Sequence, residues 1–315
     1  MKTTKTWINF VIIHVIFMGV WGALIELPEK NGFPATLGYV VWALTMIPAT
    51  GVALLVNKGK LDYDRNSVLY GSLAGILGAV GQLVLFVALK TAPAYIVFPI
   101  LSLTPVVTIL LAVIFLKEST GLTGWVGIVL AVPAILLLSY VPSDQASTSG
   151  YLWILLTIIP LVAWGTQGFV MRFANEKMKA ESIFFYMTIS SVALIPVAIW
   201  MTDFSNPINY GWDGPYLAAS IQILNAFGAL CLVYAFRYGK AIIVAPMTTA
   251  LSPVLTVVMS LIIYSVKPHP LIVAGTALAI LSALLMGKAE SKIEKKSAIK
   301  IKSKVAEAAA IHEVE

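Results

Sequence analysis

The first half of the sequence contains Gly81-Gln-Leu-Val-Leu-Phe-Val-Ala-Leu-Lys90, and the second half contains the similar stretch Gly228-Ala-Leu-Cys-Leu-Val-Tyr-Ala-Phe-Arg237. Further matches surround these two stretches. They are Ala94 to Pro99 with Ala241 to Pro246, Leu103-Thr-Pro105 with Leu251-Ser-Pro253, and Trp21-Gly22 with Trp164-Gly165. The chain therefore contains two similar units in tandem.

The composition places both units in a membrane. Of the 315 residues, 59% are hydrophobic and 11% are charged, and the mean hydropathy is +0.90, which excludes a soluble globule and a disordered chain. Lipid offers backbone groups no partner and the apolar stretches show no strand-like alternation, so each stretch of about 20 residues is expected to be a transmembrane helix. The ten expected helices are 7–25, 37–56, 68–89, 94–116, 122–141, 152–170, 183–201, 216–236, 241–265 and 271–286.

The number of helices in each unit sets their relative orientation. Five crossings are an odd number, so the second unit enters the membrane from the opposite side. The predicted fold is an all-α integral membrane protein with two inverted five-helix repeats, a build typical of secondary transporters. The expected divisions are a first repeat at 1–141, an extracytoplasmic linker at 142–150, a second repeat at 151–287 and a basic cytosolic tail at 288–315.

The distribution of positive charge predicts the topology. With the N-terminus in the cytoplasm, the outer side holds only Lys30, Lys90 and Lys267 of the 21 lysines and arginines. The positive-inside rule therefore predicts a multi-pass protein of the cytoplasmic (inner) membrane with both termini in the cytoplasm. We interpret the net charge of +6 as a result of the membrane topology, because the positive residues lie at the ends of the apolar segments, rather than as a sign of nucleic-acid binding. The stretch 7–25 could alternatively be a signal peptide, but it contains residues of the repeat.

The end of the first unit resembles a known family. The stretch Leu101-Ser-Leu-Thr-Pro-Val-Val-Thr-Ile-Leu-Leu-Ala-Val-Ile-Phe-Leu-Lys-Glu118, with Gly124 and Gly127 after it, resembles the end of an EamA-type repeat of the drug/metabolite transporter superfamily. Trp21-Gly22 resembles the start of such a repeat. The resemblance implies ten helices in two EamA units that carry small organic solutes across a cytoplasmic membrane. The second unit departs from the pattern, because Ser265-Val-Lys267 stands where a second glutamate is expected.

Polar side chains within apolar helices are the candidate substrate ligands, because such groups normally face a cavity or a partner helix. Gly71, Gly75, Gly78 and Gln82 form one helical stripe, and the matching stripe reads Ala218, Gln222, Asn225 and Ala229. The second unit thus carries two amides where the first has glycine. The predicted substrate-binding residues are His14, Trp21, Gln82, Trp164, Gln167, Gln222 and Asn225. The alternatives are a neutral histidine bonded to a neighbouring helix, packed tryptophans, and amides that bond helix to helix.

Prolines are predicted to form hinges. Each proline frees a backbone carbonyl and bends a helix, and interruptions at matching positions of two repeats indicate a transporter's site or hinge. The predicted hinge residues are Pro99, Pro105, Pro246 and Pro253. The alternative is that proline is simply common in membrane helices.

The remaining charged residues are interpreted as solvated groups. Glu118, at a helix end, Glu26 and the Asp62-Tyr-Asp64 loop are expected to be hydrated at the membrane edges. The three histidines, His14, His269 and His312, lie in different surroundings, and no metal or nucleotide motif is present. We therefore expect no cofactor, no metal site and no enzyme activity.

The sequence predicts a secondary transporter of small neutral or zwitterionic solutes that works by alternating access, in the direction of export. Its expected partners are a small-molecule substrate and membrane lipid, without nucleic acid. Proton coupling through His14 or Glu26 and uncoupled facilitation are both left open. The alternative function is a non-transporting sensor or assembly subunit that retains the transporter fold.

Overall fold

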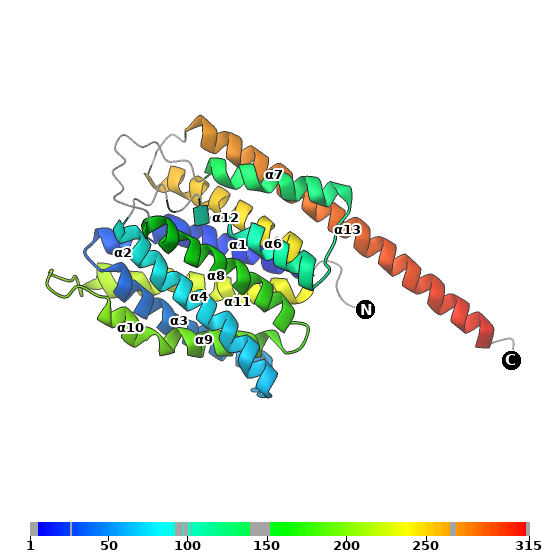
Figure 1. Ribbon diagram of the computed structural model, residues 1–315, viewed down its shortest axis with the longest axis horizontal. Helices are drawn as coiled ribbons and strands as arrows, with labels where there is room; N and C mark the ends of the chain where they lie inside the picture. The colour runs from blue at the N-terminus through cyan, green and yellow to red at the C-terminus, as the bar shows by residue number, and fades with distance from the viewer. Residues whose placement is uncertain are drawn as a thin grey trace.

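The computed structural model describes residues 6–25, 27–91, 97, 100–101, 103–138, 152–264 and 269–312. Every regular element in this part of the chain is helical (Figure 1). The helices are α1 (Thr6–Leu24), α2 (Leu27–Lys30), α3 (Ala35–Val56), α4 (Arg65–Thr91), α6 (Thr104–Phe115), α7 (Leu122–Leu138), α8 (Leu152–Ala174), α9 (Ala180–Ala193), α10 (Ile195–Trp200), η1 (Trp212–Tyr216), α11 (Leu217–Tyr238), α12 (Ala241–Tyr264) and α13 (Pro270–His312).

The predicted set of ten membrane helices is confirmed. Among the described residues, seven helical segments are long and apolar enough to cross a membrane, and three shorter apolar helices complete the set. The shorter helices are Thr104–Phe115, Leu122–Leu138 and Ala241–Thr256.

Two predicted helix boundaries are wrong, and a third helix is only partly described. The helix expected at 183–201 is divided into α9 and α10 at Leu194, because Pro196 supplies no N–H and starts a new helix instead. The helix expected at 94–116 has a turn at Leu103 and continues as α6 from Thr104, and most of its residues before Leu103 lie outside the described part of the chain. The helix expected to end at Met286 continues as α13 to His312, because the tail contains no proline or glycine after Gly287 to stop it. Figure 1 shows α13 projecting far beyond the other helices.

Eight helices pack as two bundles. We call α4, α6, α8 and α9 bundle A, and α1, α3, α11 and α12 bundle B, because the most extensive contacts among these helices lie within these sets. Each bundle takes two helices from each sequence repeat, so the two repeats are interleaved rather than side by side. Helices α7 and α13 pair with each other and pack against α12.

Small residues allow the helices of bundle A to approach closely, as is usual in membranes. A Cβ atom on Gly75 would lie 2.7 Å from the Met187 Cα atom of α9, and one on Gly78 would lie 2.3 Å from the Gln167 amide nitrogen of α8. The predicted glycine stripe therefore is a packing surface, and α4 contacts both α8 and α9 along it.

Matching contacts relate the two bundles. In bundle A the Thr108 hydroxyl donates to the Gly165 carbonyl at 2.8 Å, and in bundle B the Thr256 hydroxyl donates to the Gly19 carbonyl at 3.0 Å. By these contacts, Gly19 occupies in bundle B the position that Gly165 occupies in bundle A. The sequence alignment instead pairs Gly22 with Gly165, so it is displaced from the structural equivalence by about one helical turn.

The loops gather at two opposite ends of the molecule. Loops 57–64, 116–121, 175–179 and 239–240 meet at one end, joined by hydrogen bonds such as Lys179 N–H to Asp62 and Lys240 Nζ to the Ser119 carbonyl. We call this the Glu118 end. Helix α2 with loop 31–34 meets loop 201–211 at the other, where the Asn209 N–H donates to the Gly32 carbonyl at 3.1 Å. We call this the Asn209 end. The first described residues of α1 and the projecting part of α13 both lie toward the Glu118 end (Figure 1).

Candidate functional site

Four of the predicted ligands lie in bundle B, and three of them, His14, Trp21 and Gln222, take part in bonds between α1 and α11. His14 is buried, and its Nδ1 atom lies 2.8 Å from the Gly228 carbonyl oxygen of α11. A ring nitrogen bonded to a carbonyl must carry the proton, so Nδ1–H is the donor. The Trp21 indole N–H donates to the Gln222 amide oxygen at 3.0 Å. These bonds join α1 to α11.

The amide of Asn225 has a partner that the sequence did not reveal. The Trp42 indole N–H of α3 donates to the Asn225 Oδ1 atom at 2.7 Å. The Trp42 ring also lies against Tyr39, with 5.2 Å between the ring centroids. Trp42 belongs to the candidate site by this contact. Its only sequence signal is a tryptophan in an apolar helix, which packing alone also explains.

Trp164 and Gln167 lie in bundle A and bond to the α4 backbone. The Trp164 indole N–H donates to the Gly78 carbonyl at 3.1 Å, and the Gln167 amide N–H donates to the Ala74 carbonyl at 3.0 Å. The side chains reach these carbonyls because Gly78 and Gly81 leave space beside α4. The structure thus separates this pair from the ligands of bundle B.

Gln82 differs from the other six predicted ligands. It is partly exposed, and its amide has no hydrogen-bond partner among the described residues. An unpaired amide inside a membrane helix is costly unless water or a solute reaches it. Gln82 is therefore the candidate best placed to bind a solute without first breaking an interhelical bond.

The chemical character of the candidate site is polar and without fixed charge. Its groups are indoles, amides and one histidine, which donate and accept hydrogen bonds but leave no permanent ion in the membrane. Among the described residues, no group of three histidine, cysteine, aspartate or glutamate side chains could hold a metal ion.

The predicted hinges are not equivalent in the structure. Pro246 and Pro253 lie inside the continuous helix α12. Pro105 instead lies in the first turn of α6, directly after the turn at Leu103, where a missing N–H costs no helical bond. Pro99 lies outside the described residues.

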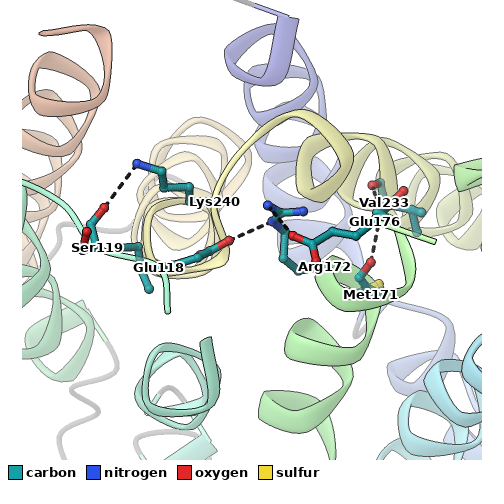
Figure 2. A network of polar contacts seen from close by, with 9 residues as sticks. Glu118, Ser119, Met171, Arg172, Glu176, Val233 and Lys240 are labelled. Carbon is teal, nitrogen blue, oxygen red and sulfur yellow. Dashed lines mark hydrogen bonds and ion pairs between the residues drawn. The ribbon is translucent and has the colours of Figure 1, made fainter. Parts of the chain in front are cut away.

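The expectation that Glu118 is solvated is also wrong. Its side chain is buried, with 8% of the residue surface exposed. Oε1 accepts the Arg172 Nε–H at 2.8 Å and Oε2 accepts the Ile242 N–H at 3.2 Å, and Figure 2 shows Glu118 and Arg172 directed at each other. Burial raises the pKa of the Glu118 carboxyl, although the Ile242 N–H and Arg172 oppose this by favouring the charged form. Glu26 and Ser265-Val-Lys267 lie outside the described residues.

The Asp62 loop is a loop, as predicted, but its first aspartate makes long-range contacts. Oδ2 of Asp62 accepts the Lys179 N–H at 2.7 Å and the Ser182 hydroxyl at 3.1 Å. Asp62 therefore caps the start of α9, whose own N-cap residue is a lysine that makes no side-chain capping bond. Carboxylates at helix N-termini are stabilising.

Two surface hollows lie elsewhere. One, of about 590 Å³, is lined by residues of η1 and the start of α11. The other, of about 280 Å³, runs between α1 and α12 and has an almost wholly apolar lining that includes Val11, Val15, Leu251 and Leu255. Neither is lined by a predicted ligand.

Comparisons with known proteins place this architecture in a class of membrane transporters. The sequence matches the EamA-like transporter family over residues 5–140 and 151–288. The chain belongs to the EamA-like transporter family, a family of transporters rather than of enzymes, with ten transmembrane helices in two inverted five-helix repeats.

Two individual similarities add to this. An uncharacterized protein of Methanocaldococcus jannaschii is 36% identical over 88 residues, which is 28% of this chain and 64% of that protein, so the chain spans less than two thirds of the relative's length. A protein of known crystal structure shares the fold with a TM-score of 0.70 at 16% identity, over 88% of this chain and 98% of the other.

Proposed function

We propose that this protein is a secondary transporter that moves small neutral or zwitterionic organic solutes across the cytoplasmic membrane by alternating access, with export as its direction. The observation that carries the proposal is the pairing of indoles with amides within bundle B, Trp21 with Gln222 and Trp42 with Asn225, without a fixed charge among them. Hydrogen-bonding groups in an otherwise apolar surrounding are typical of sites for small organic molecules.

The arrangement of the bundles supports alternating access. Inverted repeats produce two related packings, one open to each side of the membrane. Here the units that would move are bundles A and B, since each has close contacts within itself and more limited contacts with the other. The substrate would bind between them, with Gln82 on one side and the Trp42–Asn225 pair on the other.

The two ends differ in a way that supports an outward-facing state. Near the Glu118 end, α11 of bundle B packs against α8 and α9 of bundle A. In the other repeat the pair equivalent to α8 and α11 is α1 and α4, which has only marginal contact among the described residues. The α8–α11 contact thus has no counterpart of similar extent in α1 and α4, whereas α3 and α4 contact each other much as α9 and α11 do. We take the α8–α11 contact as support for closure of the Glu118 end.

We assign the Glu118 end to the cytoplasm. Its loops carry Lys58, Lys60, Lys117, Lys177 and Lys240, and positive residues favour the cytoplasmic side. The Nδ1–H of buried His14 already bonds to the Gly228 carbonyl, so transport without proton coupling is the simpler mechanism. An imposed pH gradient in the flux assay tests this point directly.

The test combines binding and transport. A thermal-shift screen of metabolites on the purified protein identifies ligands, because a ligand of the folded state raises the unfolding temperature. Radiolabelled ligand is then followed in proteoliposomes. Gln82→Ala and Asn225→Ala should abolish the ligand-induced shift and the flux, while Asn206→Ala, in an exposed loop, should leave both unchanged.

Two results separate this proposal from its alternative. Ligand binding without flux above that of empty vesicles would reject transport and support a sensor. Flux that is retained in both Gln82→Ala and Asn225→Ala would leave transport standing but reject the proposed site.

A further inference from the structure

The Glu118 end is closed by polar bonds that run from one bundle to the other. Arg237, at the end of α11, donates to the Met178 carbonyl after α8 at 2.6 Å. The Tyr234 hydroxyl of α11 donates to Glu181 of α9 at 2.7 Å, and the Asn175 amide donates to the Val233 carbonyl at 2.9 Å. Closure of this end therefore depends on specific polar contacts as well as on apolar packing.

Glu118 is distinctive in this set because it is the only buried carboxylate among the described residues. The two oxygen atoms of the Glu118 carboxylate accept hydrogen bonds from different bundles. Oε1 is held by Arg172 of α8, in bundle A, and Oε2 accepts the N–H of Ile242 in the first turn of α12, in bundle B. Hydrogen bonds to an ionised group are about twice as strong as neutral ones, so this contact is a strong polar link between α6 and α12.

The backbone around Glu118 directs the side chain inward. Lys117 adopts the left-handed conformation, with φ of 52°, which is unfavourable for a residue with a side chain. This turn lets the Glu118 N–H bond back to the Ala112 carbonyl of α6 at 3.2 Å. An αL residue of this kind is a common helix end, as Lys58 after α3 also shows, and here it turns the chain so that the Glu118 side chain reaches α12.

The partner helix can respond to the loss of this bond. The positive end of the α12 dipole lies at Ala241 and Ile242, so an anion there is favourable. Lys240, immediately before α12, donates to the Ser119 carbonyl at 3.2 Å beside Glu118 (Figure 2). Pro246 lies inside α12 within two turns of this contact. The first turns of α12 can therefore move relative to the rest of the helix, because Pro246 removes one helical hydrogen bond.

We propose that Glu118 is a latch: held by Arg172 in bundle A, it keeps the Glu118 end closed by binding the first turn of α12 in bundle B, and its release opens that end. The proposal rests on the alternating-access function proposed above. It identifies a residue that controls the conformational cycle and does not touch the substrate.

Asp62 provides a matched control. It is also a carboxylate that caps a helix N-terminus at the same end, but it joins the start of α4 to α9, both of which belong to bundle A. Removing its charge weakens a helix cap without breaking a link between bundles. Glu118→Gln and Asp62→Asn therefore make the same chemical change, from carboxylate to amide. The first changes a contact between the bundles, and the second changes a contact within bundle A.

The experiment measures the distance across the end and does not require transport. In a Cys231→Ser background, spin labels are placed through Ser119→Cys and Tyr238→Cys, two exposed positions on opposite bundles. Pulsed EPR on the full chain in lipid nanodiscs then gives the distribution of distances. Glu118→Gln should raise the ratio of long-distance to short-distance populations about tenfold or more, whereas Asp62→Asn should leave this ratio unchanged.

A second variant tests the same contact in case Glu118→Gln does not fold. Arg172→Gln leaves Glu118 in place but removes the cation that orients it, and it should shift the distances in the same direction as Glu118→Gln. An unchanged distribution in both variants overturns the latch, whether or not the protein transports anything. An equal shift in Asp62→Asn also overturns it, because general loosening of the end would then explain the result. A shift specific to Glu118 and Arg172 without solute flux would support the latch while rejecting the transport function.

Discussion

At the scale of single residues, side-chain volume decides how closely the helices approach. Gly75 and Gly78 lie where any side chain would meet α9 or α8, whereas Gly51 of α3 has open space around its Cα atom. The sequence predicted the glycine stripe. It could not distinguish stripe glycines from the others, because that difference depends on neighbours far away in the chain.

Gly75→Ala is predicted to lower the stability by about 1–3 kcal/mol, since the new methyl group would meet the Met187 backbone. Gly51→Ala is the control and should raise stability by about 0.5–1 kcal/mol through the lower entropy of the unfolded chain. Unfolding monitored by circular dichroism in detergent measures both. A loss of equal size in both variants would contradict the packing role of Gly75.

Lys117→Gly is predicted to raise stability by about 1 kcal/mol, because glycine accepts the positive φ without a Cβ clash. Lys58, with φ of 55°, should show a similar gain on substitution by glycine. Lys60→Gly removes the same charge at a residue without positive φ and should show no gain. A gain at Lys60 as large as at Lys117 would assign the effect to charge instead.

The candidate ligands show how far sequence reasoning reaches at this scale. Their residue types and helices were predictable, because a polar group within an apolar stretch stands out. Their partners were not, since Trp42 meets Asn225 only through the packing of α3 on α11. The burial of Glu118 could not be predicted for a related reason. Helices α8 and α12 bury it, and both are distant from Glu118 in the sequence.

At the scale of helices, proline has different effects in similar surroundings. Pro48 lies inside the continuous helix α3, whereas Pro196 starts the separate helix α10. Both occur in apolar stretches that the sequence equates. Because packing against neighbouring helices determines which helix continues, the ten spans could be predicted but their interruptions could not.

Pro253→Ala is predicted to straighten and stabilise α12, because the new N–H can bond to the Thr249 carbonyl, and to slow solute flux at least severalfold if α12 bends during transport. Pro105→Ala, in the first turn of α6, should change neither property strongly. Thermal unfolding and proteoliposome flux are compared for the two variants. Faster or unchanged flux in Pro253→Ala would rule out the hinge.

At the scale of the whole molecule, the repeats were visible in the sequence but their interleaving was not. Sequence similarity between the repeats shows which helices are equivalent, but it does not show which helices pack against each other. The contacts of α1 with α11 and α12, and of α8 with α4 and α6, show that each repeat completes the other's bundle. The site consequently draws on both repeats.

Cysteine labelling tests the proposed orientation. In a Cys231→Ser background, Asn206→Cys at the Asn209 end should react with an impermeant maleimide in intact cells. Ser119→Cys, at the Glu118 end, should react only after the membrane is permeabilised. Both side chains are exposed, so a difference in reactivity reports sidedness rather than burial. The reverse pattern would place the Glu118 end outside.

The exchange of helices between repeats has a consequence for how the protein is made. Helix α1 emerges from the ribosome long before α11 and α12, so it must wait in the lipid without its final neighbours while most of the chain is synthesised. Insertion and assembly are thus separate stages. A chain stopped after residue 141 would insert its spans but lack the helices of the second repeat that complete either bundle.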